Sequence, residues 1–524
     1  MRLSLKLSNC RVNVSPTNSP VPSVNPKLQS ASNHGPFKAG SGQPAFKNLF
    51  AIAGPVTGIF FPQREALRLD SENLTPRARR KVVHAGGNAK SFGVGSQSLC
   101  ELAEWELRTP RVADQTLQAG REMKKQQTAK VDEYHQRDAK RPLTEPCPIA
   151  DDVPENMPEV GVAEMDGGRL RTRQEDSPRG VKDPHWREFQ AACVVRLQSD
   201  EVAEDPRPEV PALFLCRPKV QKLVNQLHRQ KKAGAEPPAD GEETSIGEIL
   251  AEASLTENAA ETVSPGIAAD TEPSNAETDT QEETAKPKRP IRLQRTCVAT
   301  LEGADACGRI LASEAASRGL HQARRKGFVG DGMASIWAVW ERYFKPLDYV
   351  GILDFIHLLS YAYGIAMAVG HDADDSWQRY VGWITALWEG RGAEVLSEWR
   401  SLADAYDVPA TGALPDHDLR RPIQRAVTYL SNNIDRVDYP RYRRLGLPVT
   451  STLMESLVKE FNHRVKGTEK FWNDPSGAEA ILTVRAALLS EDNRFAEFFA
   501  VRPGCRYRRR STLEAEKAKL AAAG

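Results

Sequence analysis

The chain has 524 residues, enough for about three domains of ordinary size if all of it folds. Hydrophobic residues make up 40% of it and charged residues 27%, so a sizeable core can form while some segments stay unfolded. Lys and Arg (71) nearly balance Asp and Glu (70), so net charge gives no argument for nucleic acid or membrane, and such an argument must rest on local clusters.

The cysteines and the apolar runs indicate a compartment. The eight cysteines form no C-x-x-C pair, which argues against a zinc ribbon and against a disulfide-dense secreted domain. Ser8 and Arg11 interrupt the N-terminal apolar stretch, so no secretory signal is expected. The longest apolar run, 349–370, contains Asp354 and His357, which are costly in lipid. We therefore expect this run to be buried in the protein, with no membrane partner and a reducing, cytoplasmic location.

The first 150 residues divide into two parts. Residues 1–65 are rich in Ser, Pro, Asn and Gly without an apolar period, so a disordered leader is expected. Within residues 66–150, Pro76 and Pro110 each follow a threonine, the pattern of a helix N-cap with proline at the first helical position. These signals predict a small helical domain, and a helix-turn-helix is one arrangement that they permit.

Residues 155–200 predict the start of a sheet. An apolar run leads into Asp166, which two glycines follow, and 189–197 is a second apolar run that suits a buried strand. Residues 201–290 are expected to form a charged linker that begins with a basic helix. Its acidic part, 236–285, holds fourteen Asp or Glu and no Lys or Arg, as a solvated segment does.

The sheet is expected to resume in residues 291–360. Strands are predicted near 292–301, 327–330 and 349–353, with helices between them. The next segment looks almost wholly helical, and its four tryptophans are expected to lie in its core. The remaining expected segments are this helical insertion at 361–445, a return to the sheet domain at 446–490 and a basic tail at 491–524.

Three carboxylates have a context that suits metal chemistry. Asp166 and Asp331 stand where strands are predicted to end, beside glycines, and Glu455 lies in the first turn of a predicted helix. Small residues beside a carboxylate allow metal and phosphate to approach closely, and two Mg²⁺ ions held this way can activate a water and stabilise a leaving 3′ oxygen. The ordinary alternatives stay open, because Asp-Gly is a common turn and Thr452 with Glu455 matches a helix capping box.

A second pair, Asp354 and His357, would share one face of a helix. It could support a metal site, or it could satisfy its own hydrogen bonds inside a core. Motifs for nucleotide-binding loops, serine hydrolases and zinc proteases are absent from the sequence. Basic clusters with tyrosines at 436–444 and 502–510 are typical of phosphate-gripping surfaces, and equally of solvated faces.

Several strings taken together resemble bacterial insertion-sequence transposases with an RNase H-like DDE core, in particular the Kra-type (ISKra) family, which is related to mutator-like transposases. The family's V-x-x-D-G context corresponds to the string from Val162 to Gly167, which has one residue more between the valine and Asp166. The W-[KR]-E string that follows it matches at Trp186. A G-D-G segment before a tryptophan-containing helix matches at Asp331, and a [CD]-x-x-H pair matches at Asp354 with its histidine.

The last family string, P-[IV]-x-S-G-x-x-E-S, matches from Pro448 through Glu455. An R-x-K-G segment with a later tryptophan follows at Arg464 and Trp472. Thr452 replaces the usual glycine before the glutamate, and residues 1–65 have no counterpart in the family. The resemblance runs from about residue 70 to 510, with a gap at the acidic linker.

The resemblance implies an α/β RNase H-like core interrupted by an all-helical insertion, with an N-terminal helical domain and disordered segments. It implies a DNA transposase that binds terminal inverted repeats, cleaves a strand at each end and joins the freed 3′-OH to target DNA. Asp166, Asp331 and Glu455 would be the catalytic and metal-binding residues for two Mg²⁺ ions, for which Mn²⁺ can substitute, and Asp354 and His357 would support them.

The implied partners are double-stranded DNA, as terminal repeats and as target, and further copies of the chain in a homo-oligomer on that DNA. The helical N-terminal domain would contribute to DNA binding, and the protein would be associated with the nucleoid in the cytoplasm. The alternative is an inactive or repurposed transposase-derived DNA-binding protein. The side chains expected to contact DNA are Arg436, Arg441, Arg443, Arg444, Arg464 and Lys466.

Overall fold

The computed structural model describes residues 30–32, 49–51, 74–138, 159–173, 185–231, 290–466 and 471–501. By contacts, the chain forms two units, one of residues 1–76 with 503–524 and one of residues 77–502. In the predicted leader, the described strands β1 (Ser30–Ser32) and β2 (Leu49–Ala51) form an antiparallel pair. The rest of that predicted leader, the acidic stretch 236–285 and the basic cluster 502–510 lie outside the described residues.

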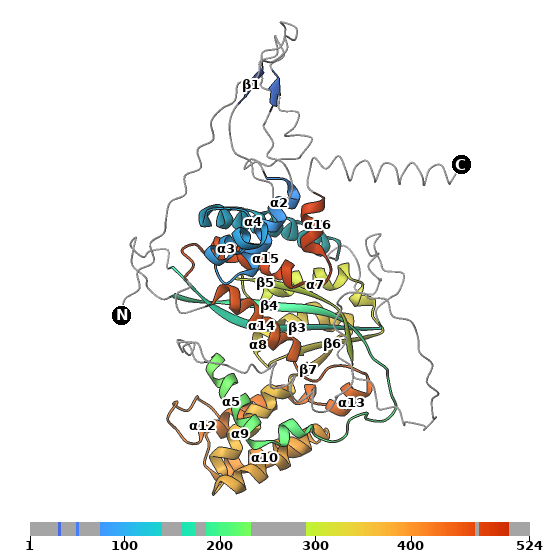
Figure 1. Ribbon diagram of the computed structural model, residues 1–524. Helices are drawn as coiled ribbons and strands as arrows, with labels where there is room; N and C mark the ends of the chain where they lie inside the picture. Colours follow the sequence, from blue (N-terminus) through green and yellow to red (C-terminus); the bar gives the residue numbers. More distant parts are fainter. Residues whose placement is uncertain are drawn as a thin grey trace, which may run out of the picture. The chain divides into compact units, whose positions relative to one another are not determined.

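The second unit is an α/β fold around a mixed five-stranded sheet (Figure 1). The strand order is β5-β4-β3-β6-β7, in which β3 and β4, like β4 and β5, are antiparallel, whereas β6 and β7 run parallel to β3. The strands are β3 (Val160–Thr172), β4 (His185–Gln198), β5 (Ile291–Thr300), β6 (Arg325–Gly330) and β7 (Val350–Leu353).

The strand β3 is longer than the sequence suggests. We expected it to end before Asp166, but it pairs residue by residue with β4 as far as Thr172, and Asp166 lies opposite Ala191. The glycines after Asp166 do not make a turn. Gly168 faces the Phe189 ring so closely that a Cβ would lie 2.3 Å from it, so glycine lets the strand continue past a bulky neighbour.

Helices cover both faces of this sheet. On one face, α14 (Thr452–Val465) packs on the hairpin, with Phe461 against Phe189 at 6.1 Å between ring centroids. On the other, α8 (Ala334–Val339) places Trp337 6.2 Å from the Phe328 ring of β6. The helix α7 (Ala304–Ser317) packs against β4 and β5. Both faces are therefore buried, as the continuous apolar runs of the strands require.

The predicted N-terminal helices form and join the sheet unit. They are α2 (Pro76–Asn88), α3 (Phe92–Ala103) and α4 (Thr109–Asp138). Gly120 of α4 lies against the backbone of Ala480 in α15 (Pro475–Leu489), so closely that a Cβ would lie 2.2 Å from its carbonyl oxygen. These helices belong to the same compact unit as the sheet.

Part of the predicted linker is also folded. The helix α5 (Arg217–Lys231) and the short turn before it pack into the core, where the Phe214 ring lies 5.4 Å from that of Phe355. The Tyr380 hydroxyl donates to the Phe214 carbonyl at 3.0 Å. The expected linker boundary at residue 201 is therefore wrong, because apolar side chains in this stretch cover the helical segment.

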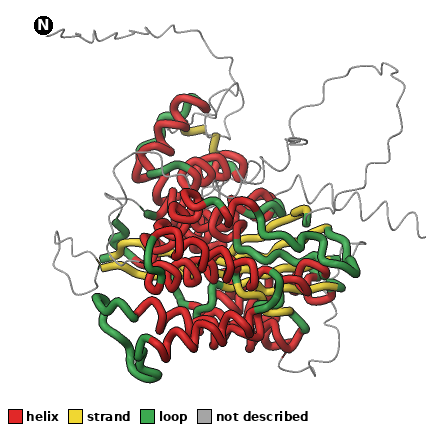
Figure 2. Tube along the Cα trace, turned by 90° about the horizontal axis from the view of Figure 1, so that it is seen from below, coloured by secondary structure: helices red, strands yellow, loops and turns green. Residues whose placement is uncertain are grey.

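A block of helices follows β7 in the chain and precedes α14. The block consists of α9 (Phe355–Val369), α10 (Ala373–Trp388), α11 (Gly392–Ala405), α12 (Arg421–Asn433) and α13 (Tyr439–Arg444). Figure 1 shows its members α9, α10 and α12 gathered together. Figure 2 shows the helices in red around the strands in yellow. Trp383, Trp388 and Trp399 are buried in this block, as expected, whereas Trp377 is partly exposed. None of the helices in the described ranges has the length and apolar composition that crossing a membrane requires.

The chain end expected to be a basic tail begins with a folded helix, α16 (Arg494–Ala500). Phe498 and Phe499 pack with Val83 and Met123 in a small second core. The predicted tail therefore starts too early, since apolar side chains bind this segment to the first helices.

Candidate active site

Two of the predicted carboxylates lie at the same level on neighbouring parallel strands. Glu164 of β3 pairs with Val329 of β6, so two residues further along Asp166 comes level with Asp331, which directly follows β6. Adjacent strands are about 4.8 Å apart. The strand register thus brings together two aspartates that are far apart in the sequence.

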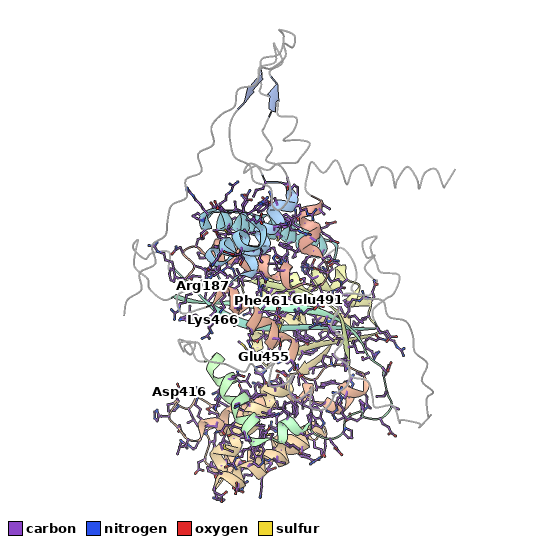
Figure 3. The ribbon with its side chains drawn as sticks, in the orientation of Figure 1. Arg187, Asp416, Glu455, Phe461, Lys466 and Glu491 are labelled. Carbon is purple, nitrogen blue, oxygen red and sulfur yellow. The ribbon has the colours of Figure 1, made fainter. Side chains whose placement is uncertain are left out.

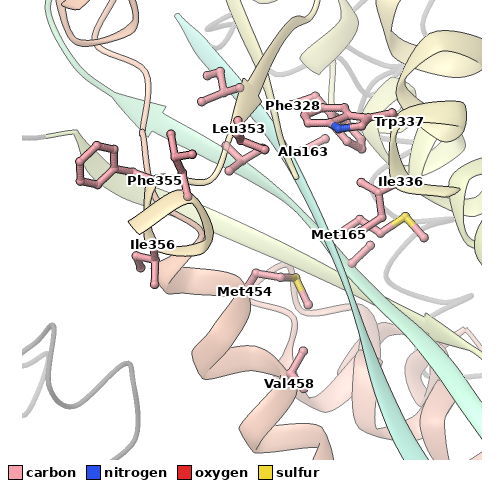
Figure 4. Packing of buried hydrophobic residues seen from close by; sticks show 14 of the residues in the cluster. Ala163, Met165, Phe328, Ile336, Trp337, Leu353, Phe355, Ile356, Met454 and Val458 are labelled. Atoms are coloured by element: carbon pink, nitrogen blue, oxygen red, sulfur yellow. The ribbon is translucent and has the colours of Figure 1, made fainter. Parts of the chain in front are cut away.

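The third carboxylate comes from α14, which crosses the face of β3 that carries Asp166. Figure 4 shows Met454 and Val458 of this helix on one side of β3, and Met165 with Ile336 on the other. Glu455 follows Met454 in the first turn and is 6% exposed (Figure 3). Packing of α14 therefore delivers Glu455 to the two aspartates.

The charges of Glu455 and Asp331 affect the pKa of Asp166. Burial, followed by the negative charges of Glu455 and Asp331, raises the pKa of Asp166 to about 8. His357 opposes this shift, as does the Gly167 N–H, which donates to Asp166 Oδ1 at 2.7 Å. Asp166 thus holds its proton near neutral pH unless a cation offsets the neighbouring charges.

A fourth carboxylate, Glu164, was missed by the sequence analysis. It is 1% exposed and lies two residues before Asp166, on the same face of β3. Burial and then the charge of Asp354 raise its pKa to about 8, although the Met454 N–H and Arg295 act in the opposite direction. Strand alternation through Asp166 was the signal that could have identified it.

Asp354 and His357 form a hydrogen-bonded pair that reaches the Glu455 helix. His357 Nδ1 donates to Asp354 Oδ2 at 2.6 Å, and the Ser451 hydroxyl donates to the same oxygen at 2.7 Å. Asp354 Oδ1 accepts from the backbone N–H groups of Ile356 and Ser451, each at 3.1 Å. Burial raises the pKa of Asp354, but the hydrogen bonds from His357, Ser451 and Ile356 outweigh it and lower the pKa.

This contact decides between two interpretations of the start of α14. The N-cap is Ser451, with no side-chain capping bond, and Thr452 is the first helical residue, so Glu455 is not at the capping-box position. Asp354 instead holds the backbone and hydroxyl of Ser451. It joins the N-termini of α9 and α14, and so sets where Glu455 lies.

Asp331 sits in the turn that the Asp-Gly pattern predicts. Its Oδ1 accepts from the Met333 N–H at 2.9 Å, and its carbonyl accepts from the Tyr429 hydroxyl at 2.7 Å. Gly332 has φ +92° and lies against the Tyr429 ring, where a Cβ would be 2.4 Å away. The turn and the functional interpretation are therefore compatible, because the turn holds the carboxylate at the end of β6.

Two of the six side chains expected to contact DNA are buried. Arg443 is 5% exposed, pairs with Asp205 and lies with its guanidinium 4.2 Å from the ring centroid of Trp388. Arg464 is 3% exposed and lies 4.4 Å from the ring centroid of Phe92. Both guanidinium groups lie against aromatic rings inside the protein, and that of Arg443 is also paired with a carboxylate. The prediction that they contact DNA is therefore wrong, and they pack in the core instead.

The other four predicted side chains reach solvent. Arg436 is partly buried over the Trp337 ring at 4.5 Å, Arg441 is exposed and Arg444 is partly exposed. The tyrosines of this cluster are core residues, however, since Tyr439 is buried and donates to the Leu353 carbonyl at 3.1 Å. The exposed side chains of this cluster are therefore arginines, and the tyrosines that its sequence suggested for the surface are buried.

Lys466 belongs to a different surface, at the end of the β3–β4 hairpin. Its Nζ is 6.0 Å from the centroid of the Trp186 ring, and the Arg171 guanidinium is 4.7 Å from the same ring. Figure 3 shows Lys466 and Arg187 near one another at this end. The hairpin end thus carries cations from three segments, of which Arg171 belongs to β3, the strand that also holds Asp166.

No protein-family model matches the chain, and no curated protein matches it either.

The donors at this site have the chemistry of cation ligands, but among the described residues their arrangement does not form a metal site. Three carboxylates supply the hard oxygen ligands that Mg²⁺ and Mn²⁺ prefer. In the described ranges, no group of three or more His, Cys, Asp or Glu side chains is arranged so that it could hold a metal ion. The fit therefore rests on donor type and on the mutual charge of Asp166, Asp331 and Glu455.

Proposed function

We propose that the protein is a DNA transposase with an RNase H-like DDE core, which cleaves DNA strands and joins the 3′-OH to target DNA. The observation that carries this proposal is the meeting of Asp166, Asp331 and Glu455, where burial and then the charges of the other two carboxylates raise the pKa of Asp166 to about 8. Three carboxylates that repel one another in a buried place are costly unless a cation from solution joins them.

The architecture supports the same proposal. The first aspartate lies on the central strand, the second follows the neighbouring parallel strand, and the glutamate comes from a helix over that strand. The helical block of α9 to α13 enters the chain between β7 and α14, before the glutamate. This is where the resemblance to Kra-type transposases expects its helical insertion.

The proposed mechanism assigns each residue a task. Asp166, Asp331 and Glu455 would hold two Mg²⁺ ions, which supply activation of the attacking oxygen and stabilisation of the leaving one. Asp354 fixes the start of α14 through Ser451, and so orients Glu455. His357 lies beside Asp166 and offsets part of the negative charge there.

DNA would be held by cations at the protein surface. Arg441, Arg444 and Lys466 reach solvent, and phosphate contacts by such side chains make affinity fall as salt rises. We propose terminal inverted repeats and target DNA as ligands, with a homo-oligomer assembling on them.

The test is strand cleavage of DNA that carries the repeats flanking the coding segment, with Mg²⁺ or Mn²⁺ against EDTA. Wild type should nick this DNA only with metal, and Glu455→Gln should lower the rate at least ~100-fold. Glu460→Gln, five residues along the same helix, is the matched control and should cleave normally. Equal DNA binding by all three proteins without nicking would instead establish the repurposed DNA-binding protein.

A further inference from the structure

Two tyrosines from different helices form a close stack beside the carboxylates. The rings of Tyr361 in α9 and Tyr429 in α12 are 3.9 Å apart at an angle of 14°. Most other aromatic pairs of the described residues are tilted or edge-on, with centroids 4.8 Å or more apart. In such a parallel stack the two rings lie face to face, one directly beside the other.

The inner ring of the stack is fixed to the site. Tyr429 is 9% exposed, and its hydroxyl donates to the carbonyl of Asp331 at 2.7 Å. Its ring also lies against Gly332, where no larger residue would fit. Any movement of Tyr429 would therefore disturb the turn that holds Asp331.

The outer ring continues a line of side chains that starts at the carboxylates. Tyr361 follows His357 by four residues, so both lie on one face of α9, about 6 Å apart along its axis. His357 Nδ1 donates to Asp354, which accepts from Ser451 at the start of the helix that carries Glu455. The surface thus leads from the carboxylates, past His357, to the Tyr361 ring.

This line ends in a cation at the protein surface. His357 is 4% exposed, Tyr361 is partly exposed and Arg425 is exposed. The Arg425 guanidinium lies 5.7 Å from the centroid of the Tyr361 ring. The guanidinium lies over the ring, so a nucleotide base that stacks there takes its place, and the exposed arginine can then meet the phosphate of that nucleotide.

We propose that Tyr361 stacks on the base next to the cleaved phosphodiester, with Tyr429 as its fixed support and Arg425 at the adjoining phosphate. This inference rests on the proposed function and assigns positioning residues within it. A stacked base would fix the strand relative to Asp331, because Tyr429 links the stack to the turn that carries this carboxylate.

The test uses DNA with 2-aminopurine on either side of the cleaved position, bound in Ca²⁺ so that binding can be read before cleavage. Wild type should quench one of the two positions, and Tyr361→Leu should lose the quenching and cleave about 10-fold more slowly in Mg²⁺. Tyr361→Trp should restore both. Tyr363→Leu is the matched control, since Tyr363 lies two residues along α9 and packs edge-on against Tyr380.

The outcomes separate the two proposals. Wild-type cleavage with Tyr361→Leu equal to Tyr363→Leu in both quenching and rate would overturn the stacking assignment and leave the transposase proposal intact. A wild type that neither binds nor cleaves would overturn both. Matching thermal unfolding of the two leucine variants shows that any difference between them is not a loss of folding.

Discussion

The protein contains two groups of largely buried carboxylates with opposite surroundings. In the first, Glu314 and Asp492 lie between Arg318 and Arg494, and Arg494 Nη2 is 2.7 Å from Glu314 Oε2 and 2.8 Å from Asp492 Oδ2. Burial raises the pKa of each acid, but the two arginines outweigh it and lower both pKa values. In the second, Asp166 is beside Glu455 and its pKa rises to about 8.

The difference shows how the fold uses acidic residues. Where a carboxylate joins α7 to the chain after α15, the protein provides the matching cations itself. Around Asp166, the neighbouring charges that raise its pKa are negative. A cluster of carboxylates without a matching cation contributes little to stability, and it suits a cation that binds from solution.

The largest contrast concerns stability. Asp492→Asn should lower the free energy of unfolding by about 3 kcal/mol, because it leaves two partly buried arginines with one carboxylate fewer. Glu455→Gln should leave this free energy unchanged or raise it, since it removes a repelling charge. Urea denaturation at pH 7 measures both, and equal losses in the two variants would remove the contrast.

The same arginine-bound group predicts a pH dependence. The pKa values of Glu314 and Asp492 are lowered on folding, so their contribution is fully present above the unfolded values, near 4, and is lost as pH falls below them. The gap between wild type and Asp492→Asn should therefore shrink between about pH 4 and pH 2. A gap that stays constant in urea titrations across this range would show that the carboxylate charge is not its source.

A smaller effect is expected at the contact between the two helix starts. Asp354→Asn should lower the unfolding free energy by about 2 kcal/mol and slow cleavage, because an amide cannot accept from His357, Ser451 and Ile356 as the carboxylate does. Asp375→Asn, at a partly exposed position in α10, is the control and should leave stability nearly unchanged. Equal, small effects would refute the positioning role.

The smallest effect is stabilisation by metal. At ten times its dissociation constant, Mg²⁺ should stabilise wild type by about 1.4 kcal/mol, read as a rise in Tm. The raised pKa of Asp166 means that a proton must leave before the cation binds, so the rise should be larger at pH 9 than at pH 6.5. A rise that is the same at both values, or that persists in Glu455→Gln, would place the ion elsewhere.

The sequence predicts the elements better than their limits. Apolar runs and the threonine-proline pairs identify β4, β6, α2 and α4, because these signals are local. The end of β3 could not be predicted, because the glycines after Asp166 suggested a turn. Gly168 instead pairs with Phe189, and its lack of a side chain lets the strand continue past that ring. Glu164 escaped for a similar reason, as its burial depends on α14, which comes almost 300 positions later.

The basic residues illustrate the same limit. Arg441 and Arg443 look alike in the sequence, yet one is exposed and the other is buried against Trp388 and Asp205. Which arginine meets solvent depends on contacts between segments that are distant in the chain. The three carboxylates were identifiable because each carries its own local pattern, whereas their meeting depends on the β3–β6 register and on α14.

The most direct measurement is Mn²⁺ binding, followed by electron paramagnetic resonance of the free ion, for wild type, Asp331→Asn, Glu455→Gln and the control Glu460→Gln. We expect wild type and Glu460→Gln to bind Mn²⁺, and each of the other two variants to bind it at least ~10-fold more weakly. Equal binding by all four proteins, or by none of them, would contradict the claim that Asp166, Asp331 and Glu455 form a cation site.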